Sequence, residues 1–193
     1  EFKNKINDIF INNSPQINHF YNKDLYRPWI ESFCKNKPYK GNGWEPYTIS
    51  IRIINILKFY LDGLISDQSI LANVRLQAKF LHLNQEKHLL GNHYLTNLKA
   101  LIFYGIIFDD KTILQSSCLS LSDELEEQIL EDGTHFELSP MYQSIVLVDI
   151  LDLINLSNAY PDEFPASLRD QLKNIATKAY GSFKRTLHPD GEI

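Results

Sequence analysis

Three short glycine-led segments, each placed ahead of a long and mostly apolar stretch, constrain this chain more than any other feature of its sequence. The segments are Gly43-Trp44-Glu45, Gly91-Asn92-His93 and Gly133-Thr134-His135, and their glycines lie 48 and 42 residues apart. Recurrence at such a period is typical of stacked helical hairpins. Polar residues at equivalent helix N-termini of such an array meet on one rim, so the repeat predicts a single site there.

The hydrophobic pattern predicts helices of two kinds along nearly all of the chain. In one kind, apolar residues recur every three or four positions, as expected of a helix with one buried and one solvent-facing side. The other kind is apolar on most sides and is expected to be buried on most sides. The first kind covers 67–87, 121–129 and 168–183, and the second covers 49–61, 92–108 and 139–156. Their alternation predicts an all-α, two-layer ring of helical hairpins in which the buried helices line a cleft.

Turn and capping residues stand directly before each buried helix, at 40–43, 90–92 and 131–134. Pro46 and Pro140 suit the first turn of a helix, where a missing N–H costs nothing. No linker is long enough to divide the chain. We therefore expect residues 1–193 to form a single domain.

Composition excludes several classes of protein. The chain has 193 residues, 44% of them hydrophobic, which is enough for one core of domain size. No apolar run is long enough to span a membrane, and no signal peptide is visible at the start. The first 100 residues carry a net charge of +5 and the remainder −10, but nucleic-acid motifs are absent. The cysteines and histidines lack metal-ligand spacing, so we expect no metal site. The missing nucleic-acid motifs and the short apolar runs lead us to expect no nucleic-acid partner and no membrane span.

Asn92 and His93 stand where a buried helix is expected to begin. Backbone N–H groups at a helix N-terminus favour an anion, and an amide with an imidazole beside them would form a receptor for a carboxylate. The alternative is that Asn92 only caps the helix and that His93 is a satisfied core histidine.

Tyr142 belongs to a polar cluster near the start of the next buried helix, together with His135, Glu137 and Ser139. A tyrosine can act as a general base when cationic or donor neighbours stabilise its phenolate. The alternative is a core aromatic residue. Glu45 and Glu137 are candidates for the paired carboxylates of a glycosidase, while Trp44 and Tyr47 could stack on sugar rings or simply pack.

Several of these motifs, taken in order, resemble the α-helical N-terminal domain of the heparinase II/III-like polysaccharide lyases. The resemblance runs from about Asn42 to the end of the chain. Its motifs are Gly43-Trp44-Glu45-Pro46-Tyr47 with Ser50, Arg52 and Asn55; Leu90-Gly91-Asn92-His93 with Asn97, Lys99 and Ala100; Asp132-Gly133 with His135-Phe136-Glu137 and Ser139-Pro140-Met141-Tyr142; and His188-Pro189-Asp190-Gly191-Glu192-Ile193.

The resemblance implies an incomplete (α/α) toroid that acts on an acidic, uronate-containing polysaccharide by β-elimination. It implies that Asn92 and His93 hold and neutralise the uronate carboxylate, while Tyr142 takes the C5 proton and protonates the leaving O4. Further substrate contacts are expected from Trp44, Glu45, Tyr47, Arg52, His135 and Glu137. Two other functions stay open, a non-catalytic glycan-binding toroid and an αα-repeat interaction scaffold.

The chain departs from the family pattern at three positions. Leu138 and Gln143 stand where the family often has arginine and histidine, and Thr96 stands where some members have an acidic residue. The family's β-sandwich domain would begin after Ile193 and would supply a further histidine and, in some members, a divalent metal. We therefore expect no cofactor in this chain, a partner in its own C-terminal domain, and no activity of the isolated chain. The resemblance also implies a periplasmic or secreted protein.

Overall fold

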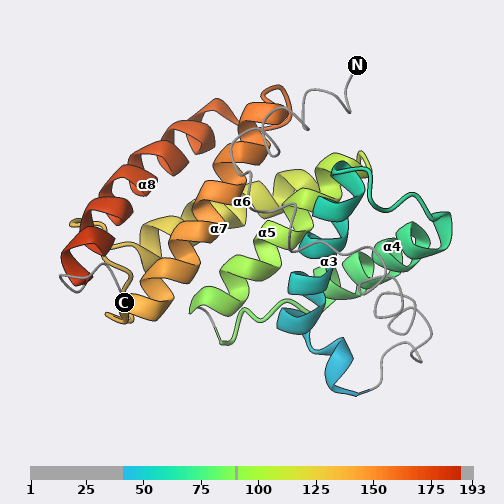
Figure 1. The fold of residues 1–193 in the computed structure, drawn as a ribbon, viewed down its shortest axis with the longest axis horizontal. Coiled ribbons are helices and arrows are strands. Elements are labelled where there is room, and N and C mark those ends of the chain that lie inside the picture. Colours follow the sequence, from blue (N-terminus) through green and yellow to red (C-terminus); the bar gives the residue numbers. More distant parts are fainter. Residues whose placement is uncertain (1–40, 90, 188–193) are drawn as a thin grey trace. The chain divides into compact units, whose positions relative to one another are not determined.

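The computed structural model describes residues 41–89 and 91–187, and this part of the chain is helical (Figure 1). Its elements are η2 (Asn42–Trp44), α3 (Pro46–Leu61), α4 (Gln68–Leu83), α5 (Gly91–Ile107), α6 (Lys111–Gln128), α7 (Pro140–Ala159) and α8 (Ala166–Thr186). The chain divides into two compact units, Glu1–Gln85 and Glu86–Ile193. The single domain expected over 1–193 stays a prediction. None of the described helices is both long and apolar enough to cross a bilayer.

In the first unit, α3 packs against α4. Pro46 begins α3, as the sequence predicts. The Asp67 side chain caps α4 by accepting a hydrogen bond of 2.8 Å from the Ser69 N–H. The buried side of α3 carries Ile49, Ile53 and Leu57, and that of α4 carries Val74, Ala78 and Leu81, all fully buried. The three- and four-residue spacing of these residues is what places them on one side of each helix.

The second unit is built around α5, which packs against both α6 and α7. All residues of α5 are buried except His93 and Ile107, as expected of a helix that is apolar on most sides. Gly105 lets α6 come close, because a β-carbon added there would lie 2.8 Å from the β-carbon of Leu114. The second hairpin, α7 and α8, packs against this core mainly through α7, with α8 also touching α6.

Helices α5 and α7 run in the same direction, so their N-termini lie at the same end of the second unit (Figure 1). Two hydrogen bonds between them show the same direction, because the first joins Thr96 to Asp149 and the second, three residues further on in both helices, joins Lys99 to Asp152. This agrees with the parallel orientation expected for the helices that follow Gly91 and Gly133. The helix that follows Gly43 belongs to the first unit.

The start of α7 agrees with the helix expected over 139–156. It begins at Pro140, after a loop that includes an isolated antiparallel bridge between Ile129 and His135. The burial of α7 differs from the expectation, because this helix is less enclosed than α5. Three of its apolar residues are exposed, Met141 by 54%, Val148 by 56% and Leu151 by 44%. Its packing against α5 and α8 covers only part of its circumference.

Candidate functional site

The first turn of α5 presents Asn92 and His93. Gly91 opens the helix with φ at +58°, a conformation that favours glycine. Asn92 is 8% exposed, whereas the side chain of His93 is 41% exposed. His93 is therefore the one residue in the first turns of α5 with a substantially accessible side chain, and it is not sealed in the core.

A buried carboxylate holds the accessible histidine. Nδ1 of His93 lies 3.1 Å from Oε1 of Glu86, a residue that is only 6% exposed. Oε2 of Glu86 accepts a hydrogen bond of 3.0 Å from the Asn97 amide, and Oδ1 of Asn97 accepts one of 2.8 Å from the backbone N–H of Glu86. Because Asn97 is fully buried, this reciprocal pair fixes both the backbone and the carboxylate of Glu86.

The loop that leads into α7 is fastened to α8 at Gly133, which has φ at +86°. A β-carbon added to Gly133 would lie 2.3 Å from the backbone carbonyl carbon of Lys178 in α8, so only glycine fits here. The hydroxyls of Thr134 and Ser182 lie 2.6 Å apart, and Arg185 donates to the Asp132 carbonyl. The backbone and hydroxyl of Thr134 both donate to the Asp132 carboxylate and lower its pKa.

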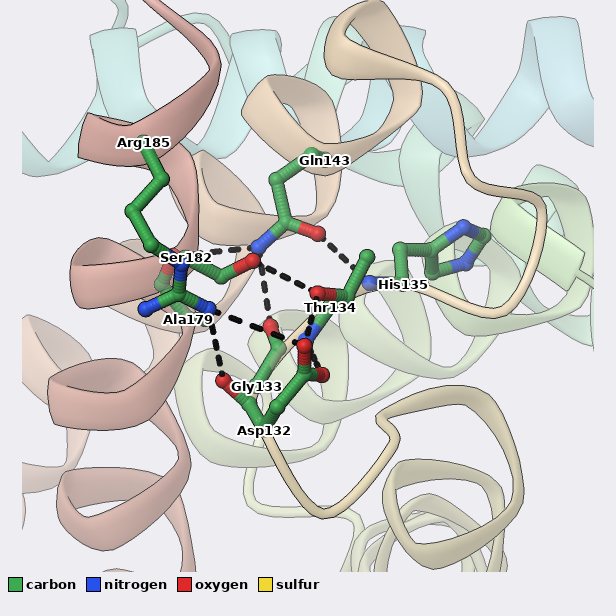
Figure 2. A network of polar contacts seen from close by, with 8 residues as sticks. All are labelled: Asp132, Gly133, Thr134, His135, Gln143, Ala179, Ser182 and Arg185. Carbon is green, nitrogen blue, oxygen red and sulfur yellow. Dashed lines mark hydrogen bonds and ion pairs between the residues drawn. The ribbon is translucent and has the colours of Figure 1, made fainter.

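Gln143, the residue after Tyr142, completes this attachment (Figure 2). Its amide oxygen accepts a hydrogen bond of 2.5 Å from the His135 N–H, and its amide nitrogen donates to the carbonyls of Gly133 and Ala179, at 3.0 Å each. Gln143 is 3% exposed. It therefore joins the loop, α7 and α8, while its neighbour Tyr142 is half-buried in the first turn of α7.

Gln128, at the end of α6, connects the start of α5 with the loop that leads into α7. Its amide nitrogen donates to the Gly91 carbonyl at 3.0 Å, and its amide oxygen lies 3.3 Å from Nε2 of His135. The Glu137 carboxylate is also close to Gly91, with Oε1 2.8 Å from where a β-carbon of Gly91 would be. The start of α5 and the loop before α7 are thus in contact.

A buried ion cluster also sets the position of α7 along α5. Nζ of Lys99 lies 2.7 Å from Oδ1 of Asp149 and 2.5 Å from Oδ2 of Asp152. The Thr96 hydroxyl oxygen lies 3.0 Å from Oδ2 of Asp149 and 2.7 Å from the Asn92 carbonyl oxygen, and its single hydrogen is donated to one or the other. Lys99 is 3% exposed, so the stabilisation of its buried ammonium group depends on these close contacts with the carboxylates of Asp149 and Asp152.

Of the predicted site residues in the second unit, Asn92, His93, Glu137 and Tyr142 lie at the end shared by α5 and α7. Glu137 is exposed. His135 lies there too but is fully buried, and burial lowers its pKa more than the Glu137 carboxylate raises it. Its ring stacks at an angle on Phe136, with centroids 4.8 Å apart. This burial favours a packing role for His135 over the predicted contact with sugar.

The other predicted residues, Trp44, Glu45, Tyr47 and Arg52, belong to the first unit. Trp44 is 8% exposed and packs edge-on against Phe80. The Arg52 guanidinium is buried and donates to the Gly43 carbonyl at 2.6 Å and to Gln77 at 2.8 Å, so it ties η2 and α3 to α4. Glu45 is exposed and Tyr47 half-buried. The geometry favours structural roles for Trp44 and Arg52, and their contact with sugar stays a prediction.

Two residues of this region had not been singled out from the sequence, Glu86 and Gln128. The only available signal was indirect, because His93 and Asn97 lie four apart and so share one helix side. Within the described ranges, no group of three histidine, cysteine, aspartate or glutamate side chains could hold a metal ion. The predicted motif at 188–193 lies outside the described residues.

Solved structures with a similar fold support the all-α architecture. The crystal structure of heparinase III matches with a TM-score of 0.67 and 22% identity, over 87% of this chain and 27% of that chain. Heparan sulfate lyase HepC from Pedobacter heparinus matches with a TM-score of 0.61 and 22% identity, over 88% and 29%. These likenesses confirm the predicted fold class, an all-α chain of the incomplete (α/α) toroid type.

Sequence comparison points to the same group of proteins. A heparin-sulfate lyase from Pedobacter heparinus is 24% identical over 114 residues, which cover 53% of this chain and 17% of that protein. The chain thus spans about a sixth of the length of this curated relative. Residues 18–189 match the family described as Heparinase II/III N-terminus. Since the match covers most of the sequence, the chain belongs to the heparinase II/III N-terminal family.

Proposed function

We propose that this chain is the helical part of a longer polysaccharide lyase that cleaves an acidic, uronate-containing polysaccharide by β-elimination. Family membership and the names of the relatives, heparin-sulfate lyase and heparan sulfate lyase, support a lyase of this class. The chain covers only 17% of one relative and 27% of another. The activity therefore concerns a longer protein, with a C-terminal sandwich domain as the second wall of the site.

The reaction requires a receptor for the uronate carboxylate. The C5 proton becomes acidic only when the adjacent carboxylate can take up negative charge, so hydrogen-bond donors must point to where that charge develops. The first turn of α5 offers such donors in Asn92, His93 and the backbone N–H groups. In our proposal these groups bind and neutralise the carboxylate.

The reaction also requires a group that moves a proton. In our proposal the phenolate oxygen of Tyr142 takes the C5 proton, and the hydroxyl formed in this way then protonates the leaving O4. A correctly placed general acid–base group contributes about 10² to 10⁴ in rate. Tyr142 is half-buried at the start of α7, so its ring is supported by packing while part of its surface stays accessible.

The observation that carries the proposal is the contact between the start of α5 and the loop that leads into α7, at the end of the second unit where both helices begin. Gln128 donates a hydrogen bond to the Gly91 carbonyl and contacts the His135 ring, and the Glu137 carboxylate lies close to Gly91. We propose that, because these segments are joined in this way, a carboxylate receptor on α5 and a proton-transfer group in the first turn of α7 serve one sugar residue.

Gln143 gives no support to the non-catalytic alternative. The family often has a histidine at this position, and its absence could indicate lost chemistry. In this chain, however, the Gln143 amide is fully engaged with His135, Gly133 and Ala179 inside the α7–α8 hairpin. Its role is to hold the loop before Tyr142, which a lyase needs as much as a binding protein does.

The test is to incubate the longer protein and the isolated 193-residue chain with heparan sulfate, other uronate polymers and a polysaccharide without uronate. Product is followed by the ultraviolet absorbance of the unsaturated uronate. We expect turnover only by the longer protein and only on a uronate polymer, because the isolated chain lacks one wall of the site. Absence of unsaturated product on every uronate polymer would refute the lyase proposal, and turnover by the isolated chain would refute the need for a second domain.

A further inference from the structure

We propose that Glu86 is a positioning residue that fixes the orientation and the tautomer of His93. This inference rests on the proposed lyase function for its role in catalysis, but the geometry is independent of it. Glu86 lies in the loop that precedes α5, and its carboxylate oxygen Oε1 is 3.1 Å from Nδ1 of His93. It thereby fixes a side chain that the helix alone would leave free to change rotamer.

The carboxylate itself has a fixed position. Asn97 donates to Oε2 of Glu86 at 3.0 Å and accepts from the Glu86 backbone N–H at 2.8 Å. The second bond determines which way the Asn97 amide faces, because only its oxygen can accept from an N–H. With Asn97 fully buried and Glu86 only 6% exposed, neither group can exchange these bonds easily for water.

The tautomer follows from hydrogen-bond chemistry. An ionised carboxylate can only accept, so the His93 nitrogen that faces it must carry hydrogen. The neutral ring is therefore protonated on Nδ1. When the ring binds a second proton on Nε2 in order to donate to a substrate carboxylate, the negative charge of Glu86 compensates the imidazolium. Glu86 thus supports the receptor role proposed for His93 without touching the substrate.

Substitution Glu86→Gln provides a sharp test, since it replaces one carboxylate oxygen by an NH₂ group and hardly changes the shape. The Asn97 amide nitrogen still points at position 86, so the glutamine oxygen must face Asn97. Its NH₂ group then faces Nδ1 of His93 and donates to it. The substitution is therefore expected to move the ring hydrogen of neutral His93 from Nδ1 to Nε2, rather than merely to weaken a contact.

The first experiment is long-range ¹⁵N–¹H correlation on the histidine-labelled 193-residue chain, recorded where the spectra show a neutral His93 ring. We expect the Nδ1–H tautomer in the natural chain and the Nε2–H tautomer in Glu86→Gln. The control Glu131→Gln changes an exposed carboxylate and should leave the His93 spectrum unaltered. An Nε2–H tautomer in the natural chain would overturn the proposal, even if Glu86→Gln failed to fold.

The second experiment measures kinetics of the same variants in the longer protein. Glu86→Gln is expected to lower kcat/KM about tenfold to hundredfold, the range of one charge-assisted hydrogen bond, and Glu131→Gln is expected to have no effect. A switched tautomer with unchanged kinetics would overturn the catalytic part of the inference. If the natural protein shows no lyase activity at all, the proposed function fails, while the tautomer measurement still decides whether Glu86 sets the state of His93.

Discussion

Replacing Gln143 by methionine tests whether this residue holds the loop before Tyr142 in place. Methionine has nearly the same length and volume as glutamine, so the change removes hydrogen bonds with little loss of packing. Gln143 is 3% exposed and bonds to three backbone groups, the N–H of His135 and the carbonyls of Gly133 and Ala179.

The expected loss of stability can be worked out from those three groups. The Ala179 carbonyl lies inside α8, where the helix provides another donor, so its loss should cost little. The N–H of His135 and the carbonyl of Gly133 are on buried residues and would be left without their Gln143 partner. Each buried group left unsatisfied costs about 1 to 3 kcal/mol, so Gln143→Met should lower the free energy of unfolding by about 2 to 6 kcal/mol.

Urea denaturation of the 193-residue chain, followed by far-ultraviolet circular dichroism, measures this loss. The matched control is Gln115→Met, at an exposed position in α6, which should change the free energy of unfolding by less than about 0.5 kcal/mol. If Gln143→Met proved as stable as the control, the hydrogen bonds of Gln143 would not hold the loop, and our explanation of this position would be wrong.

Two further predictions concern the same loop. Gly133→Ala should lower the free energy of unfolding by roughly 2 to 5 kcal/mol, because the new side chain would strain the left-handed backbone and overlap with Lys178. The control Gly63→Ala changes a left-handed glycine with open space around it and should lower the free energy of unfolding by only about 1 to 2 kcal/mol. Equal losses in the two variants would argue against a close approach of Gly133 to α8. The pKa of His135 is lowered, so the unfolded chain binds this proton more tightly and the free energy of unfolding should fall as the pH drops through about 6.5. Between pH 8 and 5, the free energy of unfolding should depend less on pH in His135→Gln than in the natural chain, whereas the exposed control His88→Gln should leave this dependence unchanged. An identical pH dependence in both variants would contradict the lowered pKa of His135.

The helices could be predicted from the sequence because their signals are local. Apolar residues at intervals of three and four mark the buried sides of α4, α6 and α8, and Pro46 and Pro140 mark two helix starts. The same reasoning placed Asn92 and His93 in the first turn of α5. The start of α6 was expected too late, at 121 instead of Lys111. Gly133 does not open a helix and instead makes the contact with α8.

The partners of the polar residues could not be predicted in this way, since they are distant in sequence. Arg52 and His135 resemble ligand-binding residues when read alone, yet they are buried against Gln77 and Gln128, respectively. Glu86 belongs to no motif that we identified in the sequence. Its relation to His93 becomes visible only in the fold, which brings the two side chains into contact. Charge and hydrogen-bonding capacity identify candidates, whereas tertiary contacts decide which of them face a substrate.

The proposed mechanism depends above all on Tyr142, so the decisive measurement is the rate of unsaturated uronate formation by the longer protein carrying Tyr142→Phe. The matched control is Tyr180→Phe, which removes the hydroxyl of a tyrosine that is 56% exposed on α8. We predict that Tyr142→Phe lowers kcat by about 10² to 10⁴ while oligosaccharide binding persists, and that Tyr180→Phe keeps the natural rate. Full activity of the Tyr142→Phe protein would contradict the role of Tyr142 in proton transfer and with it the proposed site.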